Sequence, residues 1–309
     1  MASKLDWFWN KRLPTNQAEF EAMMIELDGF LASQGKLPAQ RPFEAARQLS
    51  MRLGYSGKPL LPLERIEIKQ PFDAGWCIKA AWLWFEAIYG DKLAIDFGPG
   101  SVVLDLRGSL WRFQMPRIYG EVGLFIDTNL SNKGVSLSKP GEPPASINVL
   151  CQVDGITQPL ADRLTFEETK HIFSVFQDGY LALTKLEGIT GDDFFEQARA
   201  EYRHSVEALL ASDWAKARYD TALCAEKVFK GILRKNGKGY PTDAKKGHDI
   251  PLLGELLHTA LDITLPKPLL ESVHCPTKVR YGEMLSTGAD GLGAHRALLA
   301  VLVMLRGIK

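Results

Sequence analysis

The sequence predicts an α+β protein in which a mixed N-terminal domain with a small antiparallel sheet is followed by an all-helical bundle. Between residues 93 and 126, short segments rich in Val, Ile, Leu and aromatic residues alternate with Gly and Pro, which is typical of antiparallel strands. From Thr165 onward, apolar residues recur at spacings of three and four, which is typical of amphipathic helices. We therefore expect an α+β domain over residues 1–160, a connecting helix over 161–190, and a helical bundle over 191–309.

The bulk composition is that of an ordinary globular protein. A chain of 309 residues is long enough for two domains with separate cores, and 46% of its residues are hydrophobic. The formal net charge is zero, which argues against a protein coated in nucleic acid or bound to an anionic membrane. Residues 200–309 hold 16 Lys and Arg against 12 Asp and Glu, so the C-terminal part is mildly basic.

The cysteines and the termini indicate a cytoplasmic protein. The four cysteines, Cys77, Cys151, Cys224 and Cys275, lie far apart and form no pair with metal-ligand spacing. Isolated thiols fit a reducing cytosol. No stretch of about 18 apolar residues and no secretory signal is found, so no membrane association is expected. The sequence predicts neither a metal site nor a cofactor.

The N-terminal domain is expected to begin with helices and to continue as a sheet. Helical stripes cover residues 16–31, 43–53 and 76–89, and Gly90 ends the last of them. Strand-like segments follow at residues 93–97, 102–106, 110–115 and 122–126, with a further candidate at 147–153. Their turn punctuation predicts an antiparallel meander. The polar stretch 131–144, with two glycines and three prolines, is expected to be a long loop.

Start signals then mark a series of helices. Thr165 and Glu168 form a capping box, and Thr190 and Asp193 repeat the signal. A long helix follows around residues 214–235, and shorter ones are expected at 250–262, 267–279 and 294–305. His248 and Asp249 are expected to cap the helix at 250–262, since a carboxylate at the start of a helix satisfies unpaired backbone N–H groups.

The motifs of this C-terminal third resemble those of the HEPN family. The helix carries Ala222-x-x-Ala225-Glu226-Lys227-x-x-Lys230, a polar loop leads to Gly247-His248-Asp249, and Arg280-Tyr281-Gly282 comes later. The resemblance covers about residues 191–309, and no family is recognised for residues 1–190. It implies a helical bundle that forms homodimers, handles nucleotides or RNA, and serves bacterial stress response or defence. Ala217, Ala222 and Ala225 are expected to allow close helix packing.

Members of this family that cut RNA resemble one another in an Arg followed four to six residues later by His. His171 follows Arg163 by eight positions and His204 directly follows Arg203, so neither of these two pairs has that spacing. The leading hypothesis is therefore a nucleotide- or RNA-binding protein without the usual ribonuclease motif. One alternative is a divergent, metal-independent ribonuclease that uses Arg280 with His295 or His274. The other is a dimerising scaffold that binds no small ligand.

A basic stripe supplies the candidate phosphate ligands. Lys216, Lys227, Lys230 and Arg234 are separated by 11, 3 and 4 residues, which places them on one side of a helix. Such a stripe can hold phosphates, and a solvated helix face is the alternative. The full set of predicted ligand-binding residues is Lys216, Lys227, Lys230, Arg234, His248, Arg280 and Tyr281. For Arg280 and Tyr281, a tie between helices is the alternative to a phosphate contact.

Overall fold

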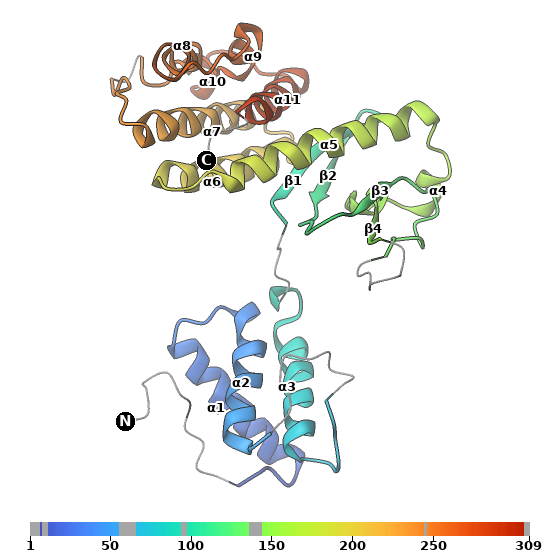
Figure 1. Cartoon of the computed structure of the whole chain (residues 1–309). Coiled ribbons are helices and arrows are strands. Elements are labelled where there is room, and N and C mark those ends of the chain that lie inside the picture. The colour runs from blue at the N-terminus through green and yellow to red at the C-terminus, as the bar shows by residue number, and fades with distance from the viewer. Residues whose placement is uncertain are drawn as a thin grey trace. The chain divides into compact units, whose positions relative to one another are not determined.

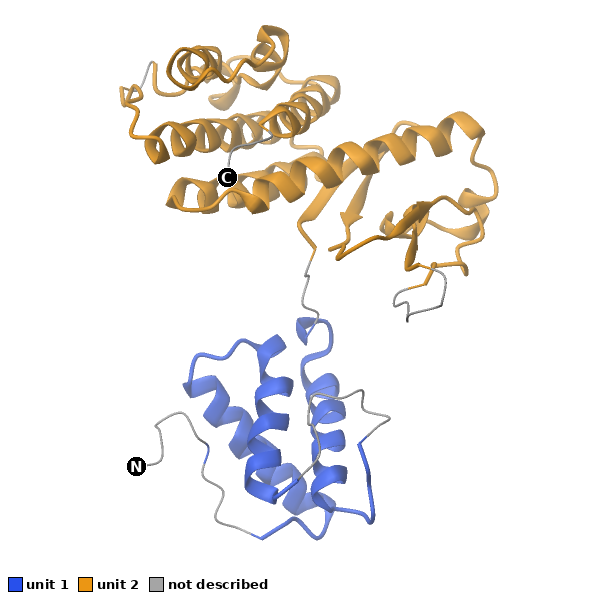
Figure 2. Ribbon diagram, viewed as in Figure 1, with its two compact units in different colours: residues 1–96 blue, residues 97–309 orange. Residues whose placement is uncertain are grey.

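A computed structural model describes residue 7 and residues 12–55, 66–93, 98–135, 144–243 and 246–305. The chain divides into two compact units, Met1–Asp96 and Phe97–Lys309 (Figure 2). This division differs from the predicted boundary near residue 160, because the strands pack with the C-terminal helices and share a core with them. The coarse prediction of an α+β protein is confirmed.

The described part of the first unit is entirely helical (Figure 1). Its elements are α1 (Gln17–Ser33), η1 (Pro38–Gln40), α2 (Arg41–Leu53), α3 (Ala74–Tyr89) and η3 (Gly90–Leu93). The side chain of Asn16 caps α1 by accepting a hydrogen bond from the backbone N–H of Glu19. Gly90 is the C-terminal cap of α3, as predicted. Residues 94–97, within the first predicted strand, and 136–143, within the predicted long loop, lie outside the described residues.

One polar cluster joins all three helices of this unit. A guanidinium nitrogen of Arg41 lies 2.9 Å from a carboxylate oxygen of Asp28, and the hydroxyl of Tyr89 donates to the other oxygen at 2.6 Å. The same Arg41 nitrogen lies 2.6 Å from the Tyr89 oxygen. Burial raises the pKa of Tyr89, and the adjacent Asp28 raises it further. The cluster thereby ties α1, α2 and α3 together around a core of Phe20, Met23, Leu27, Leu49 and Phe85.

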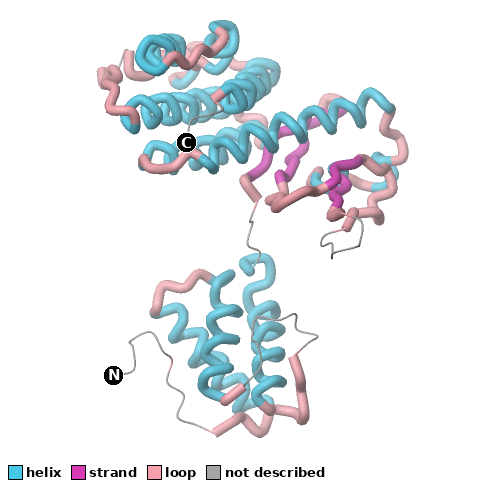
Figure 3. Tube along the Cα trace, viewed as in Figure 1, coloured by secondary structure: helices cyan, strands magenta, loops and turns pink. Residues whose placement is uncertain are grey.

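The second unit begins with a β-hairpin. Strands β1 (Gly100–Leu106) and β2 (Ser109–Met115) are antiparallel, and the turn residues Arg107 and Gly108 both have positive φ. This is the turn geometry whose twist matches paired strands. Strands β3 (Gly123–Phe125) and β4 (Ser146–Asn148) form a separate parallel pair (Figure 3). The predicted meander is therefore wrong beyond its central hairpin, and residues 149–152 of the predicted fifth strand form the helix η4 (Val149–Gln152).

Eight further helices follow in the described part of this unit. They are α4 (Gln158–Ala161), α5 (Phe166–Gly188), α6 (Asp193–Leu210), α7 (Trp214–Lys235), α8 (Ile250–Leu261), α9 (Lys267–Val273), α10 (Thr277–Arg280) and α11 (Gly288–Met304). The capping box of Thr165 and Glu168 and the cap of α8 by Asp249 are confirmed. The predicted helix 267–279 is interrupted before Pro276, because the residue preceding a proline is pushed out of the helical conformation.

The hairpin and the helices form one hydrophobic core. Gly179 on α5 lies against Val102 of β1, where an added Cβ would come within 2.7 Å of the valine side chain. On α6, the buried hydroxyl of Tyr202 donates to the carbonyl of Ser101 at 3.1 Å. Ala217, Ala222 and Ala225 are buried on α7, which confirms their packing role. The small residues thus let strand and helices approach closely.

Helix α11, the last helix of the described residues, is rich in apolar side chains. Its side chains Leu298, Leu299, Val301 and Leu302 are already buried within the same chain. The apolar character of α11 is therefore explained by packing against α5, α7 and α9. The homodimer stays a prediction that follows from the family resemblance alone.

Candidate functional site on helices α6 and α7

A buried carboxylate organises the central part of helix α7. One oxygen of Glu226 lies 2.7 Å from Nζ of Lys230, and the other lies 2.7 Å from Nδ1 of His248. The side chains of Glu226 and Lys230 are 4% and 10% exposed, whereas that of His248 is 58% exposed. Because a buried charge is costly unless it is paired, the three groups form a mutually compensating cluster.

The loop before α8 comes close enough to complete this cluster because it contains Gly247. A Cβ at this position would lie 2.7 Å from the carbonyl oxygen of Asp243 and 3.6 Å from Nζ of Lys230. Since the Glu226 carboxylate accepts from Nδ1 of His248, the second ring nitrogen, Nε2, is the one left to accept a proton or a ligand donor. The His248 ring is thus oriented by one residue and open on its other side.

Cations and aromatic rings gather at the adjacent end of α7. The guanidinium of Arg234 lies 4.3 Å from the centroid of the Phe194 ring, and Nζ of Lys227 lies 4.9 Å from the same centroid. The Phe194 ring meets the Tyr240 ring edge-on at 6.1 Å, and Nζ of Lys230 lies 5.5 Å from the Tyr240 centroid. These five residues, Phe194, Lys227, Lys230, Arg234 and Tyr240, are called the cation–aromatic cluster below.

Most positive charges of the predicted stripe have a carboxylate partner. Lys216 pairs with Asp220 at 2.8 Å, and Arg234 pairs with Asp192 and Asp193 at the start of α6. Hydrogen bonding from Arg234 lowers the pKa of Asp192. Together with the Lys230–Glu226 pair, this leaves Lys227 as the member of the four that forms no ion pair with the described residues. Three of the four cations of the predicted basic stripe are therefore already compensated by carboxylates, and phosphate binding by the stripe stays a prediction.

Arg280 stacks on aromatic rings from two elements. Its guanidinium carbon lies 4.6 Å from the centroid of Tyr219 on α7 and 5.7 Å from that of Tyr281. Burial raises the pKa of Tyr219, while the positive charge of Arg280 lowers it and the nearby Glu226 carboxylate raises it. The predicted tie between helices is confirmed. A phosphate contact by Arg280 and the exposed Tyr281 stays a prediction.

The two histidines considered as catalytic candidates are held inside the fold. His295 is fully buried, stacks on Tyr202 at 5.6 Å, and has its Nε2 3.5 Å from the backbone nitrogen of Val103. Desolvation, with a contribution from Arg296, lowers its pKa to about 4. His274 is half-buried, and burial also lowers its pKa. Two exposed imidazoles have a carboxylate neighbour instead: His248 lies 2.7 Å from Glu226, and His204 on α6 lies 3.5 Å from Glu201. Arg199 precedes His204 by five positions, so the chain does hold one Arg and His at the spacing shared by the RNA-cutting members of the HEPN family.

Three residues of this surface were not singled out by the sequence. Glu226 precedes Lys230 by four positions, a spacing that pairs opposite charges on a helix, so the signal was present. Phe194 and Tyr240 come from the start of α6 and from the loop after α7. Their contact has no signal in the sequence, because it depends on how the helices pack.

Comparison with protein-family models, curated proteins and solved structures finds no match for this chain. Among the described residues, no group of three or more His, Cys, Asp or Glu side chains is arranged to hold a metal ion. Within the same part of the chain, every helix is too short or too polar to cross a membrane.

Proposed function

We propose that the surface around the cation–aromatic cluster binds a nucleotide or a segment of RNA. The observation that carries the proposal is the placement of three cationic side chains over two aromatic rings. Single-stranded nucleic acids are bound by surfaces that combine positive charge for the phosphates with flat groups for the bases. The resemblance of the α7 motifs to the HEPN family points to the same ligand class.

The individual side chains would contribute differently. Lys227 has no carboxylate partner among the described residues and is the cation that would meet a phosphate directly. The guanidinium of Arg234 is paired with Asp192, but the side chain is 42% exposed. A base could therefore stack on the face of the guanidinium that points to solvent. Lys230 is buried against Glu226 and supports the site through His248 and Tyr240 rather than through contact with the ligand.

Binding of a fluorescein-labelled 12-nucleotide RNA, measured by anisotropy, tests the proposal together with a panel of nucleotides. We expect Lys227→Glu to weaken binding at least about tenfold, since a lost and reversed phosphate contact is worth more than 1.4 kcal/mol. Lys170→Glu, which makes the same charge change on the exposed surface of α5, serves as the matched control. Equal affinities of the two variants for every ligand would contradict the proposal.

The His248–Glu226 pair favours a second candidate, metal-independent cleavage of RNA. In such a reaction a 2′-hydroxyl attacks the adjacent phosphorus while Nε2 of His248 accepts its proton. The bond to the 5′-oxygen then breaks to leave a 2′,3′-cyclic phosphate, and the departing oxygen takes up a proton. A carboxylate that orients an imidazole is a recurrent arrangement for such a base.

Cleavage is tested by incubating the protein with RNA in EDTA and analysing the ends of the products. We expect cyclic phosphate ends with the natural chain and at least about 100-fold slower cleavage with His248→Asn, the contribution usual for a general base. His258→Asn, at an exposed histidine of α8, is the control. Intact RNA after incubation with the natural chain would exclude this candidate and leave the binding proposal standing.

A further inference from the structure

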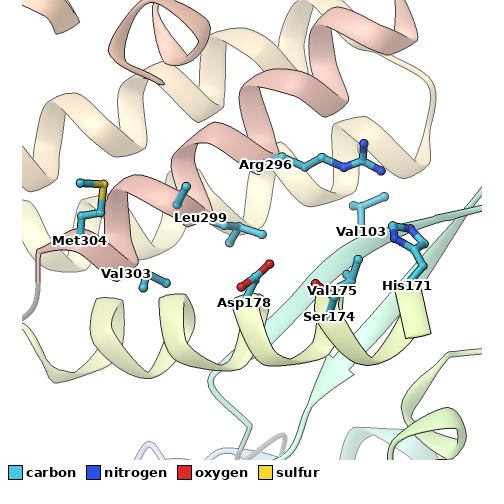
Figure 4. A pocket seen from close by; sticks show the side chains of 10 residues that line it. Val103, His171, Ser174, Val175, Asp178, Arg296, Leu299, Val303 and Met304 are labelled. Carbon is cyan, nitrogen blue, oxygen red and sulfur yellow. The ribbon is translucent and has the colours of Figure 1, made fainter. Parts of the chain in front are cut away.

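A cavity lies between helices α5 and α11, away from the cation–aromatic cluster. Its volume is about 530 Å³, and Val103 of β1 forms part of its wall. Figure 4 shows side chains from both helices pointing into this space. A volume of this size suits a small organic molecule rather than a macromolecule.

The cavity has an apolar end. Leu299, Val303 and Met304 of α11 line it there, and Met304 is 44% exposed. Val175 of α5 adds an apolar side chain near the other end of the cavity, close to Val103 (Figure 4). An aliphatic chain or an aromatic ring placed here would remove these side chains from water, which is favourable in proportion to the apolar area buried.

A carboxylate without a partner faces the middle of the cavity. Asp178 of α5 forms no ion pair or hydrogen bond with the residues that the structure describes. Its carboxyl group points into the gap toward Leu299 (Figure 4). Asp178 is exposed to solvent, so a ligand cation at this position would gain a charge-assisted hydrogen bond that is shielded from water only as far as the apolar body of the ligand covers it.

The far end of the cavity holds an ion pair. Arg296 lies there with His171, and its guanidinium is 4.0 Å from a carboxylate oxygen of Asp105. The His171 ring is held by a contact of 3.2 Å between its Nε2 and the carbonyl oxygen of Asp105. Because Asp105 is already paired with Arg296, this end offers a ligand cation no free carboxylate. The cation is thereby directed to Asp178, and the apolar body of the ligand toward Val303 and Met304.

We propose that this cavity binds a small organic amine with an aliphatic or aromatic body, whose ammonium group pairs with Asp178. The proposal does not depend on nucleotide or RNA binding, since none of the cavity residues belongs to the cation–aromatic cluster. The bound ligand is a cation whose ammonium group lies at Asp178 and whose apolar body lies toward Val303 and Met304.

Three probes that share one apolar body separate charge from hydrophobic burial: 4-phenylbutylamine, 4-phenylbutanol and 5-phenylpentanoate. Binding to the full chain is measured by methyl NMR titration, with the Val175, Leu299 and Val303 methyl groups reporting the location. We expect the amine to bind about tenfold more tightly than the alcohol, the gain usual for one charge-assisted hydrogen bond. The carboxylate probe is expected to bind most weakly of the three.

The variant Asp178→Asn keeps the shape of the side chain and removes its charge. It should reduce the preference for the amine over the alcohol to less than about twofold, whereas Glu167→Gln, an exposed carboxylate in the first turn of the same helix, should leave it unchanged. The proposal is overturned if no probe shifts the cavity methyl groups, if amine and alcohol bind equally to the natural chain, or if Asp178→Asn keeps the tenfold preference.

Discussion

Nδ1 of His248 lies 2.7 Å from a carboxylate oxygen of Glu226, which is itself almost completely buried. This contact links the loop before α8 to the middle of α7, because the other oxygen of Glu226 holds Lys230. The same carboxylate therefore has two tasks, since it neutralises a buried ammonium and orients an exposed imidazole. At Glu226 the stability of the second unit is therefore coupled to the proposed function of His248.

Removal of the Glu226 charge should destabilise the second unit. Glu226→Gln leaves the buried Lys230 ammonium uncompensated, and we expect the free energy of unfolding to fall by about 3 kcal/mol in urea denaturation. Glu196→Gln, at an exposed carboxylate of α6, should change it by less than about 0.5 kcal/mol. Adding Lys230→Met to Glu226→Gln should restore most of the loss, so strictly additive effects would contradict the pairing.

Acid should destabilise the fold through His295. Its pKa is about 4 in the folded state against about 6.5 in an unfolded chain, so the unfolded chain binds more protons between these pH values. Stability from this residue is therefore present above pH 6.5 and is lost as the pH falls toward 4, by about 3 kcal/mol in total.

The His295 contribution is measured by urea denaturation at pH 7 and pH 4.5. In His295→Leu the free energy of unfolding should fall less between pH 7 and pH 4.5 than it does in the natural chain. This holds whatever the substitution does to the stability at pH 7. His204→Gln, at an exposed histidine, should retain the natural pH dependence. If the His295→Leu chain loses as much stability in acid as the natural chain, the buried imidazole is not the cause.

Gly231 on α7 should not tolerate a side chain. An added Cβ would lie 2.6 Å from a ring carbon of the buried Phe195 on α6, so Gly231→Ala must push the two helices apart. We expect a loss of about 1–3 kcal/mol in the free energy of unfolding, as for other overpacked cores. Gly188→Ala at the end of α5 meets no atom within 4 Å and should be neutral or slightly stabilising. Equal stabilities of the two variants would refute the close approach.

The first unit should depend on the Asp28 cluster. Asp28→Asn weakens the contacts to Arg41 and Tyr89 at a site that is largely shielded from water. We expect amide hydrogen exchange in α1, α2 and α3 to accelerate by a factor that corresponds to roughly 2 kcal/mol. Peptides from α6 and α7 provide an internal reference, and Glu26→Gln on the exposed side of α1 is the control. Uniform acceleration throughout both units would show that the effect is not local.

Features encoded within a few residues were predictable from the sequence. Thr165 with Glu168, Asp249, and Gly90 mark helix ends through contacts with their own neighbours along the chain. Such signals do not depend on the rest of the fold. The amphipathic helices were predictable for the same reason. The buried side of each helix is marked by apolar residues three and four positions apart within that helix.

Features that depend on distant partners were not predictable. Strand β3 pairs in parallel with β4, which lies more than twenty residues away, and each strand has only three residues. The pairing of Arg234 with Asp192 and Asp193 has no signal in its own helix, because these partners lie about forty positions earlier. In both cases the deciding contact forms only after the elements have packed together.

The β1–β2 hairpin has a practical consequence for dissecting this protein. Its strand β1 supplies Val102 and the Ser101 carbonyl to surfaces of α5 and α6 that would otherwise face solvent. A fragment cut before α6 would lack that cover as well as α5, and should be prone to aggregation. The shared core runs from Val102 in β1 to Leu305 after α11, so a fragment that is to keep it must include both. Expression trials, deletion series and any search for autonomous evolutionary modules should respect that limit.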